Sequence, residues 1–400
     1  MQQRAINHRN KIDPDFEEFE LAHFVALERY SAATSRLEEN WNTRERFLEL
    51  IEQLDKTSSP GIPYMDVAPT IGDFLWPHGS LDQTRTDMLW YDVQKVMGGS
   101  FDHRFRVFIK DEPHSIKKAK LNKWRLIIAS NLAVQMVWRM CFTEQNNQLN
   151  AQTYLIPSHH GMVTCYGGWK RFVKYCRRNN LTFSRDLSGW DVSAPGWVFD
   201  ADLRLRTALI ENVTDEWKRV TRILYDDAFG RAKLQLSCGL VFEQQFDGYM
   251  KSGLFNTITT NSTAMFMLHV VASKRAGLPI GNFIATGDDT LQEHISDSYV
   301  RSLTEMGVLV KGDIGRDLEF MGCHYETGVP EPMYFGKHLN TLVFKADNKE
   351  DIIESYCRYY ANSKLFSFWE EVANILHVKI RERAAYQFWY NCACAKLLKY

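Results

Sequence analysis

Two acidic strings in this 400-residue chain could hold metal ions, and the first is GDD at Gly287, Asp288 and Asp289. The surrounding residues 282–293, NFIATGDDTLQE, predict a β-hairpin with a tight Gly-Asp turn. Two carboxylates at a hairpin tip are costly to remove from water together, so they either face solvent or hold a cation. Taken alone, the tripeptide also fits an ordinary hydrophilic turn.

The second acidic string is SRDLSGWDVS, which contains Asp186 and Asp191. Asp186 ends a short strand predicted over 181–186, and Asp191 follows a Ser-Gly bend, so the two carboxylates should have separate roles. Asp186 could join Asp288 and Asp289 around two Mg²⁺ ions that stabilise the attacking and leaving oxygens of a displacement. Asp191 could contact a ribose hydroxyl, or it could cap a helix in a surface turn.

A polar helix start follows in SGLFNTITTNS, residues 252–262. The pattern predicts a helix over 254–272 that presents Thr257 and Asn261 on one face, four residues apart. Asparagine offers both a donor and an acceptor, so Asn261 beside Asp191 would recognise a 2′-hydroxyl, the group that distinguishes RNA precursors. The alternative is a solvated polar helix start.

Basic residues cluster in two places, although the net charge of the whole chain is only -1. Residues 101–130 carry 8 basic and 3 acidic side chains, and residues 166–185 carry 6 basic and none acidic. The first cluster lies on a probable strand–loop–strand and contains Lys110, Lys117, Lys118, Lys120, Lys123 and Arg125. Such cations suit a triphosphate or a nucleic-acid backbone, and two solvated faces are the alternative.

The elements that must position these residues are those of a globular α+β protein, with 45% hydrophobic and 24% charged residues. Residues 57–80 are rich in Pro and Gly and predict a loop or a unit boundary. After residue 345 the chain reads as helical and aromatic-rich. The sequence predicts no transmembrane helix or signal peptide, and the eight scattered cysteines indicate mostly buried thiols in a reduced protein.

Placed in chain order, six strings resemble the motif series of the viral RNA-dependent RNA polymerases of positive-strand RNA viruses. They are TSSPGIPY, KDEP with WRLI, DLSGWD, SGLFNTITTNS, GDD and EFMGCHY, and together they span about residues 57–326. The wording of KDEPH and D-x-S-G-W-D-x-S is most similar to the sobemovirus and polerovirus-like (solemovirus-like) group. The chain departs from that group at EFMGCHY, which replaces a Phe-Cys-Ser-His string, and at a missing arginine after Asn261-Ser262.

The resemblance implies a right-hand fold of fingers, palm and thumb, with an antiparallel palm sheet and helical fingers and thumb. Residues 1–180 would form the fingers, including a template-entry loop and a basic nucleotide-binding hairpin. Residues 181–326 would form the palm, with part of 195–250 packing against the fingers, and 327–400 the helical thumb. The string 318–325 would form a primer-grip hairpin.

The resemblance also implies residue roles for RNA synthesis from NTPs with two Mg²⁺ ions, or Mn²⁺ as a substitute. Catalytic residues would be Asp186, Asp288, Asp289 and Lys311, the first three as metal ligands and the lysine as the acid that protonates pyrophosphate. Nucleotide-binding residues would be Lys110, Arg125, Asp191, Ser252, Thr257 and Asn261. Template-binding residues would be Ser59, Gly61, Pro63 and Gly253.

The expected partners are an RNA template, the nascent strand, NTPs and other replication proteins such as a viral genome-linked protein. The expected location is the host-cell cytoplasm, at membrane-associated replication complexes. Three alternatives remain at this point: a reverse transcriptase-like polymerase, a Mg²⁺ nuclease, and a non-catalytic RNA-binding protein. A reverse transcriptase has no use for the Asn261–Asp191 ribose contact, and a nuclease has no use for a triphosphate clamp.

Overall fold

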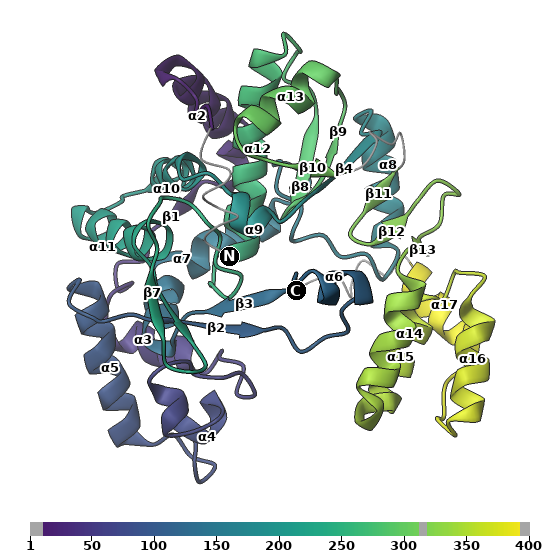
Figure 1. Cartoon of the computed structure of the whole chain (residues 1–400), viewed down its shortest axis with the longest axis horizontal. Coiled ribbons are helices and arrows are strands. Elements are labelled where there is room, and N and C mark those ends of the chain that lie inside the picture. Colours follow the sequence, from purple (N-terminus) through teal and green to yellow (C-terminus); the bar gives the residue numbers. More distant parts are fainter. Residues whose placement is uncertain (1–10, 312–317, 393–400) are drawn as a thin grey trace.

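The computed structural model describes residues 11–311 and 318–392. Its buried hydrophobic residues form two clusters. The larger one runs from Ala22 to Val308, and the smaller one joins residues 162–181 and the 284–291 strands to the C-terminal helices. Figure 1 shows these C-terminal helices on the opposite side of the molecule from the helices α3, α4 and α5.

A four-stranded antiparallel sheet carries the acidic strings. Its strand order is β10-β4-β9-β8, with β4 Phe183–Leu187, β8 Phe283–Thr286, β9 Asp289–Gln292 and β10 Val310–Lys311. The helices α12 Thr257–Arg275 and α13 Asp297–Glu305 pack against each other, and α12 also packs on β8, whose four residues are all buried. The antiparallel sheet, the hairpin at 282–293 and the helix through 272 are therefore confirmed.

A second four-stranded sheet lies beside this one, in the order β3-β2-β6-β7. Its strands are β2 Phe105–Ile109, β3 Leu126–Ala129, β6 Lys233–Leu236 and β7 Val241–Glu243, and α6 Ile116–Lys120 lies between the first two. The β2–β3 pair confirms the predicted strand–loop–strand. The parallel β2–β6 pair joins residues far apart in sequence, a contact that was not predicted from the sequence.

Helices surround the two sheets on the N-terminal side. They are α2 Phe16–Tyr30, α3 Arg44–Ile51, α4 Ile71–Leu75, α5 Gln83–Met97, α7 Leu132–Ala151, α8 Gly168–Arg178, α9 Trp190–Ser193, α10 Trp197–Ala208 and α11 Asp215–Tyr225. Shorter pieces are η1 Ser31–Ala33, β1 Ser35–Arg36, η2 Tyr64–Asp66, β5 Ile210–Glu211 and η3 Asp226–Gly230. The stretch 57–80 is a loop with two short helices and not a unit boundary, because Tyr64, Phe74 and Leu75 are buried in the larger core.

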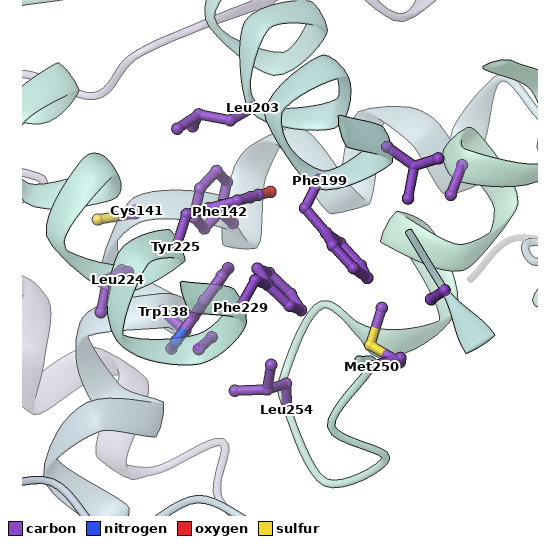
Figure 2. Packing of buried hydrophobic residues seen from close by; sticks show 14 of the residues in the cluster. Trp138, Cys141, Phe142, Phe199, Leu203, Leu224, Tyr225, Phe229, Met250 and Leu254 are labelled. Atoms are coloured by element: carbon purple, nitrogen blue, oxygen red, sulfur yellow. The ribbon is translucent and has the colours of Figure 1, made fainter. Parts of the chain in front are cut away.

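Aromatic packing in the larger core anchors the loop that precedes α12. Phe199 and Phe229 stack nearly parallel, with ring centroids 3.9 Å apart. Figure 2 shows Met250 and Leu254 beside this pair, and both side chains are buried. Ser252 and Gly253 are thus held between two apolar anchors, one on each side in the chain.

The smaller core holds the C-terminal helices. These are α14 Phe335–Phe344, α15 Lys349–Tyr359, α16 Phe366–Ile375 and α17 Arg383–Asn391, with η4 Ala346–Asn348 between the first two. A three-stranded antiparallel sheet of β11 Glu319–Phe320, β12 Cys323–His324 and β13 Glu331–Pro332 precedes them, which confirms the hairpin at 318–325. The helix α8 also belongs to this core, and the Trp169 indole donates a hydrogen bond of 3.0 Å to Asn391 Oδ1.

The described cysteines are all free thiols, and four of the seven are buried: Cys141, Cys176, Cys323 and Cys357. The eighth, Cys394, lies outside the described residues. Within residues 11–311 and 318–392, none of the helices has the length and apolar character needed to span a bilayer.

Candidate active site

A pocket of about 430 Å³ lies between the antiparallel sheet and the β2–β3 hairpin. Five of the residues predicted to act together line it: Arg125, Asp191, Ser252, Asp288 and Lys311. The pocket therefore gathers side chains from five separate segments, spread over nearly 190 positions of the sequence. Its size is in the range of small-molecule sites.

Two tight turns place the carboxylates at this pocket. Gly189 has φ +64° and begins α9, so Asp191 lies in the first turn of a helix that is preceded by a left-handed residue. Gly287 has φ +63° in the turn between β8 and β9, and the half-buried Asp288 follows it. Glycine adopts this conformation without steric cost, which explains both sharp turns.

Asp191 and Asp288 repel each other electrostatically across the pocket. The pKa of Asp191 is raised from 3.8 to about 6, first by burial and then by the Asp288 charge, while Arg125 lowers it. A cation placed beside the two carboxylates would favour their charged forms and lower the pKa of Asp191.

The strand register brings Asp186 to the same end of the sheet. The Cα atoms of Asp186 and Lys311 are register partners in β4 and β10, and Arg185 is the register partner of Thr290, next to Asp289. The backbone of Asp186 therefore lies at the end of the sheet where β9 begins. Its side chain lies outside what the structure describes.

Two consecutive residues of α12 connect both acidic turns to one helix. Asn261 Oδ1 accepts a hydrogen bond of 2.8 Å from the indole of Trp190, the residue before Asp191. Ser262 Oγ accepts one of 2.9 Å from the backbone N–H of Gly287, the residue before Asp288. Both bonds are buried, so α12 fixes the spacing between the two carboxylate-bearing turns.

The predicted Asn261–Asp191 contact is not a direct one among the described hydrogen bonds, since Asn261 contacts Trp190. Thr257 donates its hydroxyl to the backbone oxygens of Lys251, at 3.0 Å, and Leu254, at 2.8 Å. These two hydrogen bonds close the loop before α12. The sugar-binding roles of Asp191, Thr257 and Asn261 therefore stay predictions.

The loop before α12 also connects the pocket walls. Met250 N donates to Asp191 O at 2.8 Å, Gly253 N donates to Ile128 O at 3.0 Å, and Ile128 N donates to Ser252 Oγ at 3.3 Å. The loop thus joins α9 to β3. A displacement of Ser252 would therefore alter backbone contacts to both α9 and β3.

A single carboxylate holds the two cations predicted to bind triphosphate. Glu112 lies 3.1 Å from Lys110 Nζ and 3.2 Å from Arg125 Nη1. Its pKa is lowered; burial opposes this decrease, and hydrogen bonds and charge attraction from Lys110 and Arg125 produce it. The Arg125 backbone N–H donates to His114 Nε2 at 3.1 Å, which fixes the end of the hairpin.

The residues predicted to bind template surround one short backbone segment, 128–131. A Cβ on Gly61 would lie 2.8 Å from Asn131 Cα, and a Cβ on Gly253 would lie 2.8 Å from Ala129 Cα. Leu132 N donates to Pro60 O at 2.9 Å, which brings the Ser59–Pro63 stretch to the same place. The structure thus brings residues about 190 positions apart to one corner.

Five of the six basic residues predicted to form a surface at 166–185 are exposed, and Arg185 is the exception. The cluster at 166–185 included Arg185, which is buried and donates to Tyr299 Oη at 3.1 Å. Lys170 donates to Asn391 O at 2.9 Å, and the Arg171 guanidinium lies over the Tyr154 ring. Arg185 therefore serves the core, and the use of the exposed basic residues of α8 for phosphate binding stays a prediction.

Sequence reasoning missed four contributors to the site: Glu112, Trp124, Trp190 and Ser262. Trp190 lies in DLSGWD, next to the predicted Asp191, and Ser262 lies in SGLFNTITTNS, next to the predicted Asn261. Their positions in these two motifs could have indicated a role in the site. Glu112 stands in KDEPH, two residues after Lys110, which is a spacing that allows a local ion pair. Trp124 precedes Arg125 and is an exposed aromatic residue among cations.

The carboxylates that line the pocket suit a hard divalent cation. Carboxylate oxygens are the ligands that Mg²⁺ prefers, and Asp191 and Asp288 share a site in which added positive charge would lower the pKa of Asp191. Among the described side chains, no group of three or more His, Cys, Asp or Glu residues is placed to hold a metal. That search does not include the Asp186 side chain.

This fold is that of a right-hand polymerase. The chain superposes on the Sicinivirus 3Dpol RNA-dependent RNA polymerase with a TM-score of 0.77 and 16% sequence identity, covering 96% of this chain and 87% of the other. The order of sheet, helices and loops around the pocket therefore has a solved counterpart. The likeness concerns the fold alone.

The sequence comparison gives the family. The profile of the viral RNA-dependent RNA polymerases matches residues 9–324, and the chain belongs to this family. The RNA-directed RNA polymerase of Mushroom bacilliform virus is 26% identical over 356 residues, which are 82% of this chain and 84% of that protein.

Other relatives are much longer proteins. Protein P1-P2 of Pea enation mosaic virus-1 is 26% identical over 75% of this chain, and the replicase polyprotein P2AB of Southern bean mosaic virus is 28% identical over 69% of it. The matched parts are 26% and 30% of those two proteins. The chain thus spans about a quarter to a third of these relatives, and the sobemovirus and polerovirus-like resemblance is confirmed.

Proposed function

We propose that this protein is an RNA-directed RNA polymerase that extends an RNA 3′-end with nucleotides complementary to an RNA template. The observation that carries the proposal is the pocket in which Arg125, Asp191, Asp288 and Lys311 meet. Acids for metal binding and cations for phosphate binding face one cavity, as nucleotidyl transfer from NTPs requires. Membership of the viral polymerase family supports this assignment.

Each side chain then has a defined task. Arg125 and Lys110 bind the triphosphate once Glu112 releases them, and Asp191 and Asn261 hold the ribose. Asp186, Asp288 and Asp289 would hold two Mg²⁺ ions, which supply charge stabilisation for the attacking and leaving oxygens. Lys311 lines the pocket and donates a proton to the departing pyrophosphate.

The template path follows from the corner at 128–131. Gly61 and Gly253 let the Ser59–Pro63 stretch and the loop before α12 pack directly on the chain's own backbone at 128–131, because a Cβ on either glycine would lie 2.8 Å from that backbone. We assign this corner to the template strand. Residues 1–180, 181–326 and 327–400 then act as fingers, palm and thumb, and in the infected cell the protein works at cytoplasmic, membrane-associated replication complexes with other viral proteins.

The test is RNA synthesis on a defined single-stranded template with four NTPs and Mg²⁺, with and without a primer. We expect template-length product that disappears with EDTA. Product formation without a primer would show de novo initiation. No incorporation by a folded protein under either condition would contradict the proposal.

The matched variants are Asp288→Asn and Asp297→Asn. Asp288 lines the pocket, so its amide should reduce incorporation by at least about 10³-fold while RNA affinity changes little. Asp297 begins α13, outside the pocket, and its amide should leave incorporation near the parent level. Full activity of a folded Asp288→Asn protein would exclude this site.

A further inference from the structure

Trp124 is an exposed aromatic ring inside the pocket. It lines the same cavity as Arg125, Asp191 and Asp288, and 41% of its surface is accessible. Other aromatic residues are exposed as well, such as Tyr91, but Tyr91 lies outside the lining of this pocket and Trp124 belongs to it. The neighbouring cations and carboxylates leave the base as the nucleotide part with no partner in the proposed site.

The other two aromatic residues of the pocket lining are already engaged. Trp190 is buried and donates its indole N–H to Asn261, and Tyr249 is buried with Lys251 Nζ 4.9 Å from its ring centroid. Of the aromatic rings that line this cavity, Trp124 is therefore the one with a large exposed area. An accessible π-face is what nucleobases of every kind stack on.

The position of the indole is fixed from the side. The imidazole of His114 packs against Trp124 edge-on, with ring centroids 5.3 Å apart and planes at 76°. His114 is itself held, since its Nε2 accepts the N–H of Arg125 at 3.1 Å. A pre-positioned ring loses little conformational freedom when a base stacks on it.

We infer that Trp124 is a stacking platform for the base of the incoming nucleotide, next to the phosphate-binding Arg125. The inference rests on the proposed function, because it places a nucleoside triphosphate in this pocket. It adds a base-binding residue that tolerates all four bases, with more contact for purines than for pyrimidines because purines have two fused rings. His114 is then a positioning residue for the stacking ring, and it also holds the Arg125 backbone.

The experiment compares equilibrium binding of ATP and of inorganic tripolyphosphate, which has no base, to the parent protein and to Trp124→Ala and Trp124→Phe. Stacking on one ring contributes about 5- to 150-fold in affinity. We expect Trp124→Ala to weaken ATP binding by about 5-fold or more and tripolyphosphate binding by less than about 2-fold. Trp124→Phe should recover most of the ATP affinity, which a merely structural loss would not allow.

Steady-state incorporation supplies the second measurement. We expect the KM for ATP and GTP to rise more than the KM for UTP and CTP in Trp124→Ala, with RNA affinity unchanged. Tyr91→Ala on α5 is the matched control, since Tyr91 is 63% exposed and lies outside the pocket lining. This control should keep the parent KM values.

Three results would overturn the inference. Equal losses for ATP and tripolyphosphate would mean that Trp124 only places the cations. A weaker RNA affinity with unchanged KM values would assign the ring to a template base. Unchanged ATP binding in folded Trp124→Ala would remove any stacking role. Absence of templated synthesis by the parent protein would instead refute the proposed polymerase function. The comparison of ATP with tripolyphosphate would still show whether Trp124 stacks on a base.

Discussion

Glu112 would set the strength of the proposed phosphate site. It pairs with both Lys110 and Arg125, which are 37% and 59% exposed, so each pair is partly solvated. Ion pairs of this kind contribute about 0–1 kcal/mol each. A triphosphate with several negative charges can therefore replace the carboxylate at low cost.

Glu112→Gln should lower the KM for NTPs by about 2- to 5-fold, because the amide keeps the size of the side chain but no longer competes for the two cations. The KM is measured by steady-state incorporation at low salt. Glu39→Gln, an exposed glutamate on the N-terminal side of the chain, is the control. A higher KM in Glu112→Gln would mean that the carboxylate positions the cations for phosphate.

The raised pKa of Asp191 leads to a second prediction, on the pH dependence of stability in the metal-free protein. Its folded-state pKa of about 6 lies above the ordinary 3.8, so the folded protein holds this proton more tightly than the unfolded chain does. The resulting stability is present below pH 4 and is lost as the pH rises through 6. At pH 8 the ionised carboxylate costs about 3 kcal/mol, as an upper limit.

Asp191→Asn should therefore raise the free energy of unfolding by up to about 3 kcal/mol at pH 8, and this gain should shrink as the pH falls from 6 towards 4. Urea unfolding between pH 4.5 and pH 8 measures the difference. Added Mg²⁺ should reduce the gain, since a divalent cation stabilises the ionised parent. A pH-independent gain would show that burial and the Asp288 charge do not act on Asp191.

At the scale of elements, α12 is the part that holds the site together. Its polar residues bind neighbouring segments: Asn261 binds Trp190, Ser262 binds Gly287, and Thr260 donates to the buried Asp202 at 2.8 Å. Asp202 also pairs with the buried Arg206 at 3.0 Å. The polar start of this helix is thus a framework of buried hydrogen bonds, which are costly to break.

Ser262→Ala tests this framework. Loss of the hydroxyl leaves the buried Gly287 N–H without an acceptor, which should cost about 1–3 kcal/mol of stability and displace the Asp288 turn. We expect kcat to fall by about 10-fold or more while the KM for NTPs changes less. The control is Ser302→Ala on α13, a buried serine whose hydroxyl bonds only the helix backbone at Ser298 O.

Ser302→Ala should keep the parent kcat, although it also removes a buried hydroxyl. Equal kcat values for the two folded variants would contradict the coupling between α12 and the GDD turn. A kcat loss confined to Ser262→Ala would support it.

Local patterns were enough to predict the parts of the site that depend on neighbours in sequence. The hairpin around Gly287 and the helix after Thr257 follow from turn residues and apolar spacing, and the structure confirms both. The parallel β2–β6 pair and the Ser262–Gly287 bond join distant segments, and no local pattern indicates such contacts. Residues 162–181 likewise pack with the C-terminal helices through tertiary contacts that composition does not reveal.

At the scale of the whole molecule, charge is segregated. The net charge is -1, yet Lys117, Lys118, Lys120 and Lys123 are exposed together on and after α6 and have no acidic partner among the described residues. In Figure 1 this helix lies between the strands β2 and β3 and the C-terminal helices. A local field of this kind attracts a phosphate backbone whatever the average charge is.

RNA affinity should therefore fall steeply with salt, and the double variant Lys117→Gln/Lys120→Gln should show a smaller dependence. Each lost contact to single-stranded RNA lowers the slope of log K against log salt by about 0.7, so the pair should lower it by up to about 1.4. Binding of a defined single strand between 50 and 300 mM salt, roughly the range over which such losses are large, measures it. Lys218→Gln on α11, which is exposed and paired with Asp215 at 3.1 Å, should keep the parent slope because its charge is already balanced. If the double variant and the control shared one slope, RNA would have to bind elsewhere, and the basic hairpin would serve the triphosphate alone.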